Sequence, residues 1–462
     1  MDGLESALEK MRAEGLGEAA VETFARQYRR LQEGETGTLA ESEIEPVADL
    51  PDAEELPDAE APLDQAVIIK LNGGLGTSMG MSKAKSLLEV KDGKTFLDLI
   101  AEQVLDLRER SGARLPLVLM NSFATREDSL EALARYPDLS AGLPPDFVQN
   151  KVPKITEDGL TPVSHPDDPA LEWAPPGHGD LYTALVTSGM LDALLEGGYR
   201  WAFVSNSDNL GAVLDPRILA HLADSAAPFL MEVADRTSSD RKGGHLARRA
   251  SDGGLVLREI AQTPDEDLDA FQDIERHRYF NTNTLWVDLH ALRDVLGDDG
   301  VLDLPMIVNR KTVDPSDKSS TPVIQLETAM GAAIGVFDGA TALRVPRSRF
   351  VPVKTTNDLL SLRSDAYVVG EGRAVHLAPE REGVPPFVDL DSDYYKLVAD
   401  FDARFPSGAP SLVACDALHV HGDVTFGAGV VVRGEVTIDG PATVPDGAVL
   451  EGDGGGAQPT SA

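Results

Sequence analysis

The sequence predicts an α/β protein whose helix-flanked sheet carries a helical extension at the N-terminus and a small parallel β-helix at the C-terminus. From residue 65 onward, short apolar runs alternate with helical segments, as in a sheet covered by helices. The first ~35 residues place apolar side chains at helical spacing. Residues 413–452 repeat glycine after short β-branched runs, about six residues apart, which is typical of stacked coils.

The N-terminal region is predicted to form two amphipathic helices that pack onto the body. Apolar positions recur every three or four residues, and a glycine break separates the two sets. Residues 41–64 are acidic and contain prolines without an apolar period, so we expect an exposed tether with little structure. The periodic positions are Leu4, Leu8, Met11, Ala20, Phe24 and Tyr28.

The central region is predicted to form a parallel strand–loop–helix–strand unit. Thr95 can cap a helix with Asp98 three residues later, and the helical pattern ends near Gly112. In such sheets the ligand cleft lies beyond the carboxyl ends of the strands. The expected strands are residues 67–71, 115–120, 201–205, 229–233 and 284–287.

Composition limits the possible partners and metal sites. A chain of 462 residues with 42% hydrophobic content suggests two to three globular domains. The net charge of −36 argues against nucleic acid and anionic membranes, which attract cationic proteins. No apolar run approaches the roughly 18 residues of a membrane span, and no export signal is visible, so we expect a cytoplasmic protein. With Cys415 as the single cysteine and no Cys/His cluster in the sequence, any metal must be bound by oxygen.

The excess of acidic residues has its own interpretation. A salt-rich cytoplasm would explain it as a solvated surface, because salt confines charge repulsion to a few ångströms. We treat salt adaptation as a hypothesis.

A glycine-rich segment, KLNGGLGTSMGMSKAKSLLEV at residues 70–90, is predicted to cradle phosphate. Asn72, Gly73 and Gly74 follow an apolar run, and glycine lets backbone N–H groups approach an anion closely. Lys83 and Lys85 supply the positive charge. The spacing matches neither the dinucleotide fingerprint nor the Walker loop. A glycine-rich turn without ligand is the alternative interpretation.

A second polar segment, WAFVSNSDNLG at residues 201–211, is predicted to hold a metal ion. A strand of bulky residues delivers Asn206, Ser207 and Asp208 at its end, where a carboxylate can bind Mg²⁺ while water and phosphate oxygens complete the shell. We expect Asp208 to be the metal ligand. The alternative is an Asx-turn at the end of a strand.

Other segments also end apolar runs with polar groups. Gln149 could pair its amide with a base edge, although a loop glutamine in water is the common case. Gly177 and Gly179 flank His178, for which we favour hydrogen bonding over a general-base role, since an ionised phosphate nucleophile needs no base. Lys354, between a strand and a helix, is a second candidate for neutralising phosphate.

Two further segments suggest sugar recognition. Asn281, Thr282 and Asn283 form a dense set of neutral donors and acceptors, which sugar hydroxyls require. Gly243 and Gly244 permit close backbone approach, although a simple hairpin turn would also explain them.

Taken together, the ordered motifs resemble the eukaryotic-type UDP-glucose pyrophosphorylases over roughly residues 65–440. The motifs are LNGGLGTSMG, FVQNKVPKI, PPGHGDLY, SNSDNLG, KGG, FNTNTLW, LETAMGAAI, VPRSRFVPVKTT and GDVTFGAGVVVRG. The resemblance implies a glycosyltransferase-A-like, Rossmann-like nucleotide-binding domain with a helical N-terminal extension and a C-terminal left-handed parallel β-helix. The implied divisions are an extension and acidic linker at 1–64, a nucleotidyltransferase domain at 65–372, the β-helix at 373–455 and a flexible tail at 456–462.

The resemblance also implies a reaction: transfer of uridylyl from UTP to glucose 1-phosphate by in-line attack at the α-phosphorus, with Mg²⁺ and without a covalent intermediate. Lys85, Lys354 and Asp208 would be catalytic, and Asp208 would hold the metal. The implied UTP contacts are Leu71, Asn72, Gly73, Gly74, Lys85, Gln149, Gly177, Asp208 and Lys354. The implied sugar-phosphate contacts are His178, Asn206, Ser207, Asp208, Gly243, Gly244, Asn281, Thr282 and Asn283.

Alternatives stay open at this point. The glycine and proline usual before the loop lysine are Lys83 and Ala84 here, so the working lysine is either Lys83 or Lys85. The chain could be a broad-specificity UDP-sugar pyrophosphorylase, or a catalytically silent nucleotide-sugar scaffold. An NAD-dependent oxidoreductase would need another glycine spacing and an acidic residue where the next strand ends at Met120 and Asn121. The β-helix could mediate homo-oligomerisation.

Overall fold

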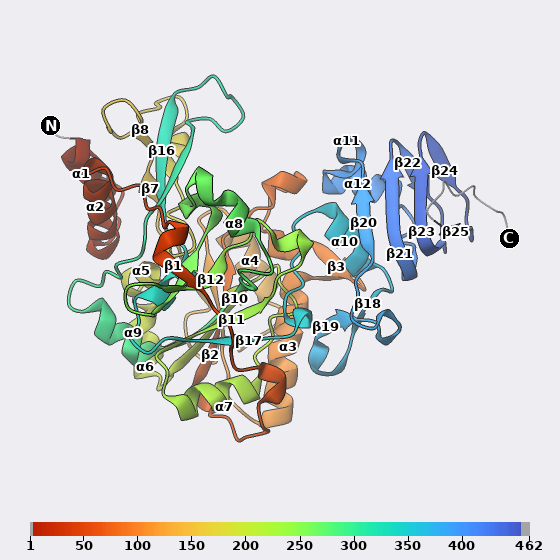
Figure 1. Cartoon of the computed structure of the whole chain (residues 1–462), viewed down its shortest axis with the longest axis horizontal. Helices are drawn as coiled ribbons and strands as arrows, with labels where there is room; N and C mark the ends of the chain where they lie inside the picture. Colours follow the sequence, from red (N-terminus) through yellow and green to blue (C-terminus); the bar gives the residue numbers. More distant parts are fainter. Residues whose placement is uncertain (1–2, 454–462) are drawn as a thin grey trace.

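The computed structural model describes residues 3–453 and is built around a ten-stranded mixed sheet (Figure 1). Its centre consists of β2 (Ala66–Asn72), β5 (Leu117–Asn121), β6 (Asp146–Val148) and β10 (Trp201–Asn206), which run parallel in the order β10-β2-β5-β6. On the other side, β14 (Tyr279–Asp288) pairs antiparallel with β10. The carboxyl ends of β2 and β10 therefore reach the same edge of the sheet.

The remaining strands extend the sheet beyond β14. One branch is antiparallel and ends at the N-terminal β1, and in the other β11 pairs with both β14 and β17. The five strands expected from sequence are confirmed, the second beginning two residues later than expected. The strands that extend the sheet in these two branches are β1 (Ile44–Pro46), β11 (Phe229–Asp235), β12 (His245–Arg249), β13 (Leu255–Arg258) and β17 (Thr341–Arg344).

Both faces of the central strands are buried, which explains their continuous apolar sequences. On β2, Ile68 belongs to one core with Leu99 of α3 (Phe96–Ser111), whereas Val67 and Ile69 belong to another with Leu181 of α5. The helix cap predicted at Thr95 and Asp98 is present, and α3 ends at Gly112. No helix within residues 3–453 is long and apolar enough to cross a membrane. The other helices of this region are α4 (Arg126–Leu133), α5 (Asp180–Thr187), α6 (Met190–Glu196), α7 (Pro216–Ser225), α8 (Leu268–Gln272), α9 (Leu289–Leu296) and α10 (Thr356–Arg363).

The predicted N-terminal helices are confirmed as α1 (Gly3–Ala13) and α2 (Glu18–Gln32). They share a small core with Val152 and Ile324. Short strands lie beside them: β7 (Val152–Pro153), β8 (Ile155–Thr156), β9 (Trp173–Ala174), β15 (Ile307–Thr312) and β16 (Pro322–Glu327).

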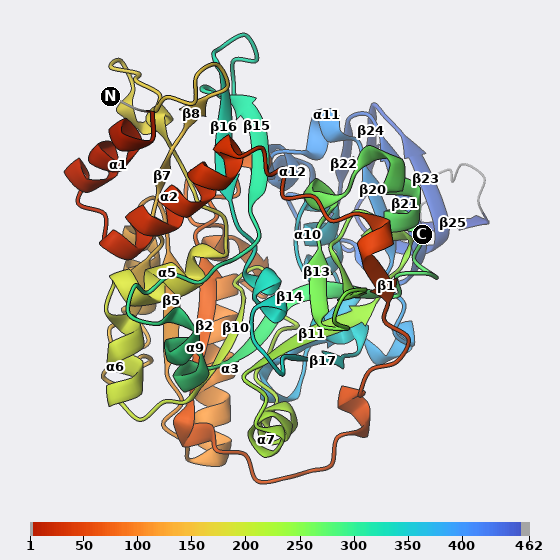
Figure 2. The same ribbon diagram turned by 60° about the vertical axis from the view of Figure 1, so that its left-hand side comes forward.

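The expectation of an exposed tether with little structure at 41–64 is confirmed only in part, because most of the segment is exposed and irregular but it is anchored to the body. The segment leaves α2, pairs with β12 through β1 and continues around α7 (Figure 2). Ile44, Val47 and Ala53 are buried, and Glu41 and Asp52 accept from buried or half-buried arginines. Irregularly spaced apolar residues and paired carboxylates fix the segment, and such anchors leave no periodic signal in sequence.

The C-terminal part consists of two stacked parallel ladders. One contains β20 (Phe387–Leu390), β21 (Ser411–His421), β23 (Val431–Asp439) and β25 (Val449–Asp453). The other pairs β22 (Val424–Phe426) with β24 (Ala442–Val444). The predicted parallel stacking is therefore confirmed, whereas the predicted tail at 456–462 lies outside the described residues. Smaller elements join this part to the body: β3 (Glu89–Lys91), β4 (Lys94–Thr95), β18 (Tyr367–Val369), β19 (Val375–Leu377), α11 (Ser392–Tyr395) and α12 (Val398–Arg404).

Candidate active site

The candidate site forms where β2 and β10 end side by side. Leu71 pairs with Asn206 in the parallel register, and the N–H of Ser207 donates to the carbonyl of Leu71 at 3.1 Å. The glycine loop turns back on itself, because the Lys85 N–H donates to the Gly74 carbonyl at 2.9 Å. Two sequence motifs that lie far apart in the chain are thereby brought to one edge.

The two loops meet in a salt bridge between Lys85 and Asp208. Lys85 Nζ lies 2.7 Å from Asp208 Oδ2, and both side chains are partly accessible. Lys83 is exposed and has no hydrogen bond or ion pair within residues 3–453. The structure thus distinguishes two lysines that sequence left as alternatives.

The Asp208 loop is held from behind by a buried lysine. Lys70 Nζ donates to Ser205 Oγ at 2.7 Å and to the Ala212 carbonyl at 2.8 Å, so it ties the start of the loop to its end. Asn209 fixes the middle of the loop by accepting from Val351 N and donating to the Arg349 carbonyl. Burial lowers the pKa of Lys70 to about 7. Sequence reasoning had passed over Lys70, which looked like one more strand residue.

An ion pair beneath the loop completes this support. The Arg349 guanidinium donates two hydrogen bonds at 2.7 Å to Glu232, whose side chain is fully buried. Trp286 Nε1 donates to the same carboxylate at 2.8 Å. A fully buried carboxylate needs such partners to remain charged.

On the opposite side of the glycine loop lies Gln149. Its N–H donates to the Asn121 carbonyl at 2.8 Å, which continues the pairing of β5 with β6. A Cβ added to Gly73 would come within 2.9 Å of Gln149 Oε1, so this glycine lets the loop approach the amide. The Asn72 side chain points elsewhere, since its Nδ2 donates to Asn121 and Ser129.

The loop containing His178 packs against Thr328. Gly177 has φ +78°, and a Cβ there would lie 2.4 Å from the Thr328 carbonyl oxygen, so both conformation and space require glycine. His178 Nδ1 accepts from the Met330 N–H at 2.9 Å. Burial lowers the pKa of His178 to about 4, so at neutral pH the ring is uncharged and its Nε2 carries the proton as a donor.

The residues predicted to face the sugar occupy a bulge of β14 and the loop before β12. Asn281 Nδ2 donates to Asn283 Oδ1 at 2.9 Å, and the two amides stabilise each other. The Thr282 hydroxyl instead donates to the Glu232 carbonyl at 2.8 Å. The Asn281 N–H donates to the Gly244 carbonyl at 3.0 Å, whereas a Cβ on Gly243 would be 3.3 Å from the Asp240 carbonyl oxygen, in the adjoining turn.

A carboxylate that sequence reasoning missed lies on this side. A Cβ on Gly244 would come within 2.5 Å of the Glu259 carboxylate. Burial raises the pKa of Glu259, and the positive charge of Lys354 opposes that shift. Glu259 comes directly after the buried strand β13, so the rule that polar groups end buried strands could have identified it.

Lys354 reaches the site from a third direction. The preceding residue, Val353, donates its N–H to the Asp208 carbonyl at 3.3 Å, and Pro352 forms a β-bridge with Asn209. The side chain of Lys354 is exposed, while its N–H donates to Asp358 at 2.8 Å. Lysines from two separate segments therefore lie next to the Asp208 loop.

No group of three or more metal-ligating His, Cys, Asp or Glu side chains occurs within residues 3–453. Asp208 contributes one carboxylate. That donor set fits Mg²⁺, which is held by one or two carboxylates together with substrate phosphates and water, rather than by an all-protein cage.

Comparison with known proteins decides the family. The sequence profile of the UTP–glucose-1-phosphate uridylyltransferase family matches residues 21–433. The chain belongs to this family. The UTP–glucose-1-phosphate uridylyltransferase of Hordeum vulgare is 42% identical over 98% of the chain and 96% of its own length. That of Saccharomyces cerevisiae is 43% identical over 84% and 77%.

Solved structures agree with this assignment. A UDP-glucose pyrophosphorylase mutant from Leishmania major, crystallised with UDP-glucose, is 48% identical over 98% of both chains, with a TM-score of 0.91. A Trypanosoma brucei UDP-glucose phosphorylase is 46% identical over 98% of this chain and all of its own, with a TM-score of 0.87. The resemblance seen in the motifs is therefore confirmed, and uridylyltransferase relatives share the mixed α/β architecture throughout.

Proposed function

We propose that this chain makes UDP-glucose and pyrophosphate from UTP and glucose 1-phosphate. The observation that carries the proposal is the meeting of Lys85 and Asp208 at the carboxyl ends of β2 and β10, in a chain 48% identical to a protein crystallised with UDP-glucose. Phosphoryl-type transfer depends on positioning and on cations that offset phosphate charge. A lysine at hydrogen-bonding distance from a carboxylate, between two strand ends, suits that demand.

In this proposal UTP lies along the glycine loop. The backbone from Leu71 to Gly74 and at Gly177 contacts the nucleotide, and Gln149 reads the uracil edge through its amide. Lys85 and Lys354, which both lie next to the Asp208 loop, hold the phosphates. The close approach of Gly73 to Gln149 supports this arrangement, since a side chain at residue 73 would displace the amide.

Glucose 1-phosphate lies on the other side of the Asp208 loop. His178, as a neutral Nε2 donor, binds a sugar or phosphate oxygen. The Asn281–Asn283 pair and the Gly243–Gly244 backbone face the hydroxyl groups, and Glu259 adds a carboxylate acceptor. Asn206, Ser207 and Thr282 shape this side of the pocket, Thr282 through its bond to the Glu232 carbonyl.

The metal in this proposal is Mg²⁺, held by Asp208. Bound there, it would neutralise phosphate charge. The protein residues do the remaining work. Lys85 and Lys354 draw together two polyanionic substrates, and aligned backbone amides of the glycine loop stabilise charge on the departing pyrophosphate. An ionised sugar-phosphate oxygen attacks the α-phosphorus in line, and no proton has to move.

The experiment that tests the function measures pyrophosphate release from UTP with a panel of sugar 1-phosphates. Glucose 1-phosphate should give the highest kcat/KM. Similar values for galactose and uronic acid phosphates would favour the broad-specificity alternative. No release with any sugar, despite UTP binding, would favour a silent scaffold.

We also propose a left-handed β-helix for the C-terminal part, homo-oligomerisation through it, and a cytoplasmic location. Paired residues of β22 with β24 and of β23 with β25 are 18 positions apart, as in Val424–Ala442 and Val431–Val449, which suits three six-residue faces per coil of a left-handed β-helix. We propose the domain limits 65–372 and 373–455, of which residues 454 and 455 lie outside the described part of the chain. Homo-oligomerisation through this region is testable by light scattering, and the cytoplasmic location by fractionation.

A further inference from the structure

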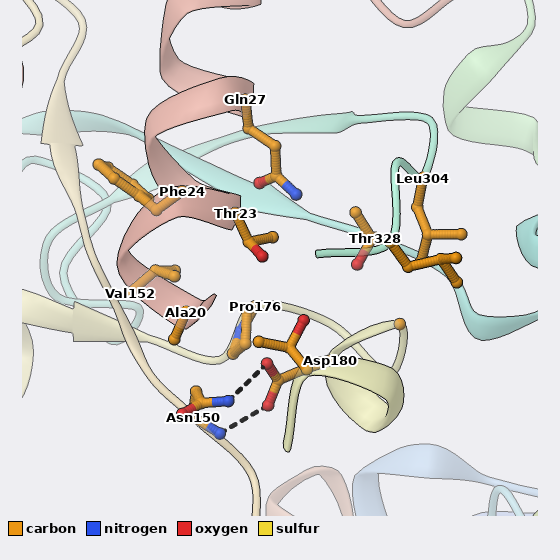
Figure 3. Close-up of a pocket in the computed structure, with 13 residues that line it drawn as sticks. Ala20, Thr23, Phe24, Gln27, Asn150, Val152, Pro176, Asp180, Leu304 and Thr328 are labelled. Atoms are coloured by element: carbon orange, nitrogen blue, oxygen red, sulfur yellow. Dashed lines mark hydrogen bonds between the residues drawn. The ribbon is translucent and has the colours of Figure 1, made fainter. Parts of the chain in front are cut away.

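The aspartate that follows the histidine loop is buried in an unusual way. Asp180 begins α5, and both carboxylate oxygens bind the same residue (Figure 3). One accepts from Asn150 N at 2.6 Å and the other from Asn150 Nδ2 at 2.9 Å. Within residues 3–453 no lysine, arginine or histidine forms an ion pair with Asp180. Both hydrogen bonds of the carboxyl group therefore hold Asn150.

Burying this carboxyl group without a cation costs free energy, which indicates that the contact does more than start a helix. Burial without a cation raises the pKa of Asp180 to about 7. The α2 side chains Phe24 and Gln27 line, together with Asp180, a cavity of about 20 Å³ that has room for one water (Figure 3). An uncharged side chain would be buried at this position with a smaller loss of free energy.

Asn150 and Asp180 each adjoin a segment that is proposed to contact the nucleobase of UTP. Asn150 directly follows Gln149, whose own N–H is fixed by Asn121. Asp180 directly follows the loop Gly177–Gly179. That loop is anchored on Thr328, because Gly179 N donates to the Thr328 carbonyl at 2.9 Å and Thr328 N donates to the Pro176 carbonyl at 2.9 Å.

We propose that Asp180 is a positioning residue for nucleobase recognition. Its carboxyl group fixes the distance between Gln149 and the Gly177–Gly179 loop, and so sets the affinity of the site for the uridine end of UTP. It touches neither substrate nor the reacting phosphorus. The inference rests on the proposed function, since it needs UTP to bind between these segments.

The test uses a reciprocal exchange in the full chain. In Asp180→Asn the new side-chain NH₂ group replaces one of the two oxygens that accept from Asn150. One of the two donors of Asn150 then faces another donor and loses its hydrogen bond. Adding Asn150→Asp restores a donor–acceptor pair with the roles reversed. Asp98→Asn is the matched control, because Asp98 is also a buried carboxyl in the first turn of a helix but binds Thr95 and Tyr136, away from the site. Circular dichroism and thermal melting verify that each variant is folded.

Calorimetry with UTP, uridine and pyrophosphate then gives the outcome. Loss of a buried hydrogen bond should weaken UTP and uridine binding about tenfold in Asp180→Asn. Pyrophosphate affinity and kcat at saturating UTP should change less than about threefold, and the double variant should regain UTP affinity. Asp98→Asn should bind UTP like the wild type.

The inference is overturned if Asp180→Asn binds UTP within twofold of wild type. It is also overturned if the double variant stays as weak as the single one, or if kcat falls while the dissociation constant for UTP stays unchanged. Failure of the wild type to bind UTP would instead overturn the proposed function, so the two failures are distinguishable.

Discussion

Lys85 and Asp208, which are 123 residues apart in the sequence, lie 2.7 Å apart between the ends of β2 and β10. Each is the principal charged partner of the other in the structure. Substrate phosphates and Mg²⁺ would therefore enter a site in which a cation and an anion are already fixed at close range. That pre-arrangement avoids reorganisation when charge develops on the leaving group.

Lys85→Ala should reduce kcat on the order of 10²- to 10³-fold, as loss of one preorganised donor does in other enzymes. Lys83→Ala is the matched control, because Lys83 is an exposed lysine of the same loop without a partner in the described chain. Pyrophosphate release at saturating substrates measures both variants. Equal losses in the two, or a larger loss in Lys83→Ala, would assign the working role to Lys83.

Asp208→Asn should weaken the Mg²⁺ dependence of UTP binding. The amide keeps the size of the carboxylate but loses the charge that a hard cation requires. Calorimetric titration of UTP with and without Mg²⁺ should give a large difference in the wild type and a small one in the variant. Asp215→Asn, on the same connection but paired with Arg217, is the control and should behave as wild type in this titration.

The sequence predicted several segments of the candidate site, because each motif ends a buried strand or flanks a glycine. Asn206, Asp208 and Gln149 were identified in this way, and parallel pairing places the first two beside the glycine loop. The same rule applied to residues 255–258 would have identified Glu259. The local sequence pattern is therefore sufficient to indicate candidate site residues where the chain leaves a buried strand at the edge of the sheet.

Buried polar contacts between distant segments could not be predicted. Lys70 lies within a predicted strand and Asp180 received no role, and only the fold places them beside Ala212 and Asn150. The anchoring of residues 41–64 to the body was missed for the same reason, because Glu41 accepts a hydrogen bond from Arg258, which is 217 residues away in the sequence. Such contacts depend on tertiary packing and leave no period in the sequence.

Gly177→Ala should abolish most UTP binding, because the added Cβ meets the Thr328 carbonyl oxygen at 2.4 Å and φ is +78°. Gly189→Ala is the matched control, with φ +75° and no atom within 4 Å. The control should lose about 1 kcal/mol of stability from backbone strain and keep its UTP affinity. Calorimetry and urea denaturation separate the two effects. Normal UTP binding by Gly177→Ala would contradict a backbone contact at this loop.

Lys70→Met should remove a pH dependence of stability. In the unfolded chain a lysine keeps its proton up to about pH 10.4, whereas folded Lys70 releases it near 7. Between these values the unfolded state binds more protons, so the free energy of unfolding rises with pH, by about 1.4 kcal/mol per unit at most from this group. Urea denaturation at pH 7 and pH 9 should show a smaller rise in Lys70→Met than in the wild type, whereas Lys83→Met should match the wild type. An unchanged rise in Lys70→Met would mean that Lys70 stays protonated in the fold.

The apparent KM for UTP should fall as KCl rises from low ionic strength toward 1 M. A net charge of −36 surrounds the lysines of the site with a repulsive field for a polyanionic substrate. Salt shortens the reach of that field from about 10 Å at 0.1 M to about 3 Å at 1 M, while the Lys85–Asp208 contact acts at shorter range than either. Initial rates at several KCl concentrations, with Mg²⁺ held in excess, measure the trend. Uridine, which is neutral, serves as the control ligand and should bind with little dependence on salt. A KM for UTP that stays constant or rises with KCl would show that local attraction by Lys85 and Lys354 already outweighs the field of the acidic surface.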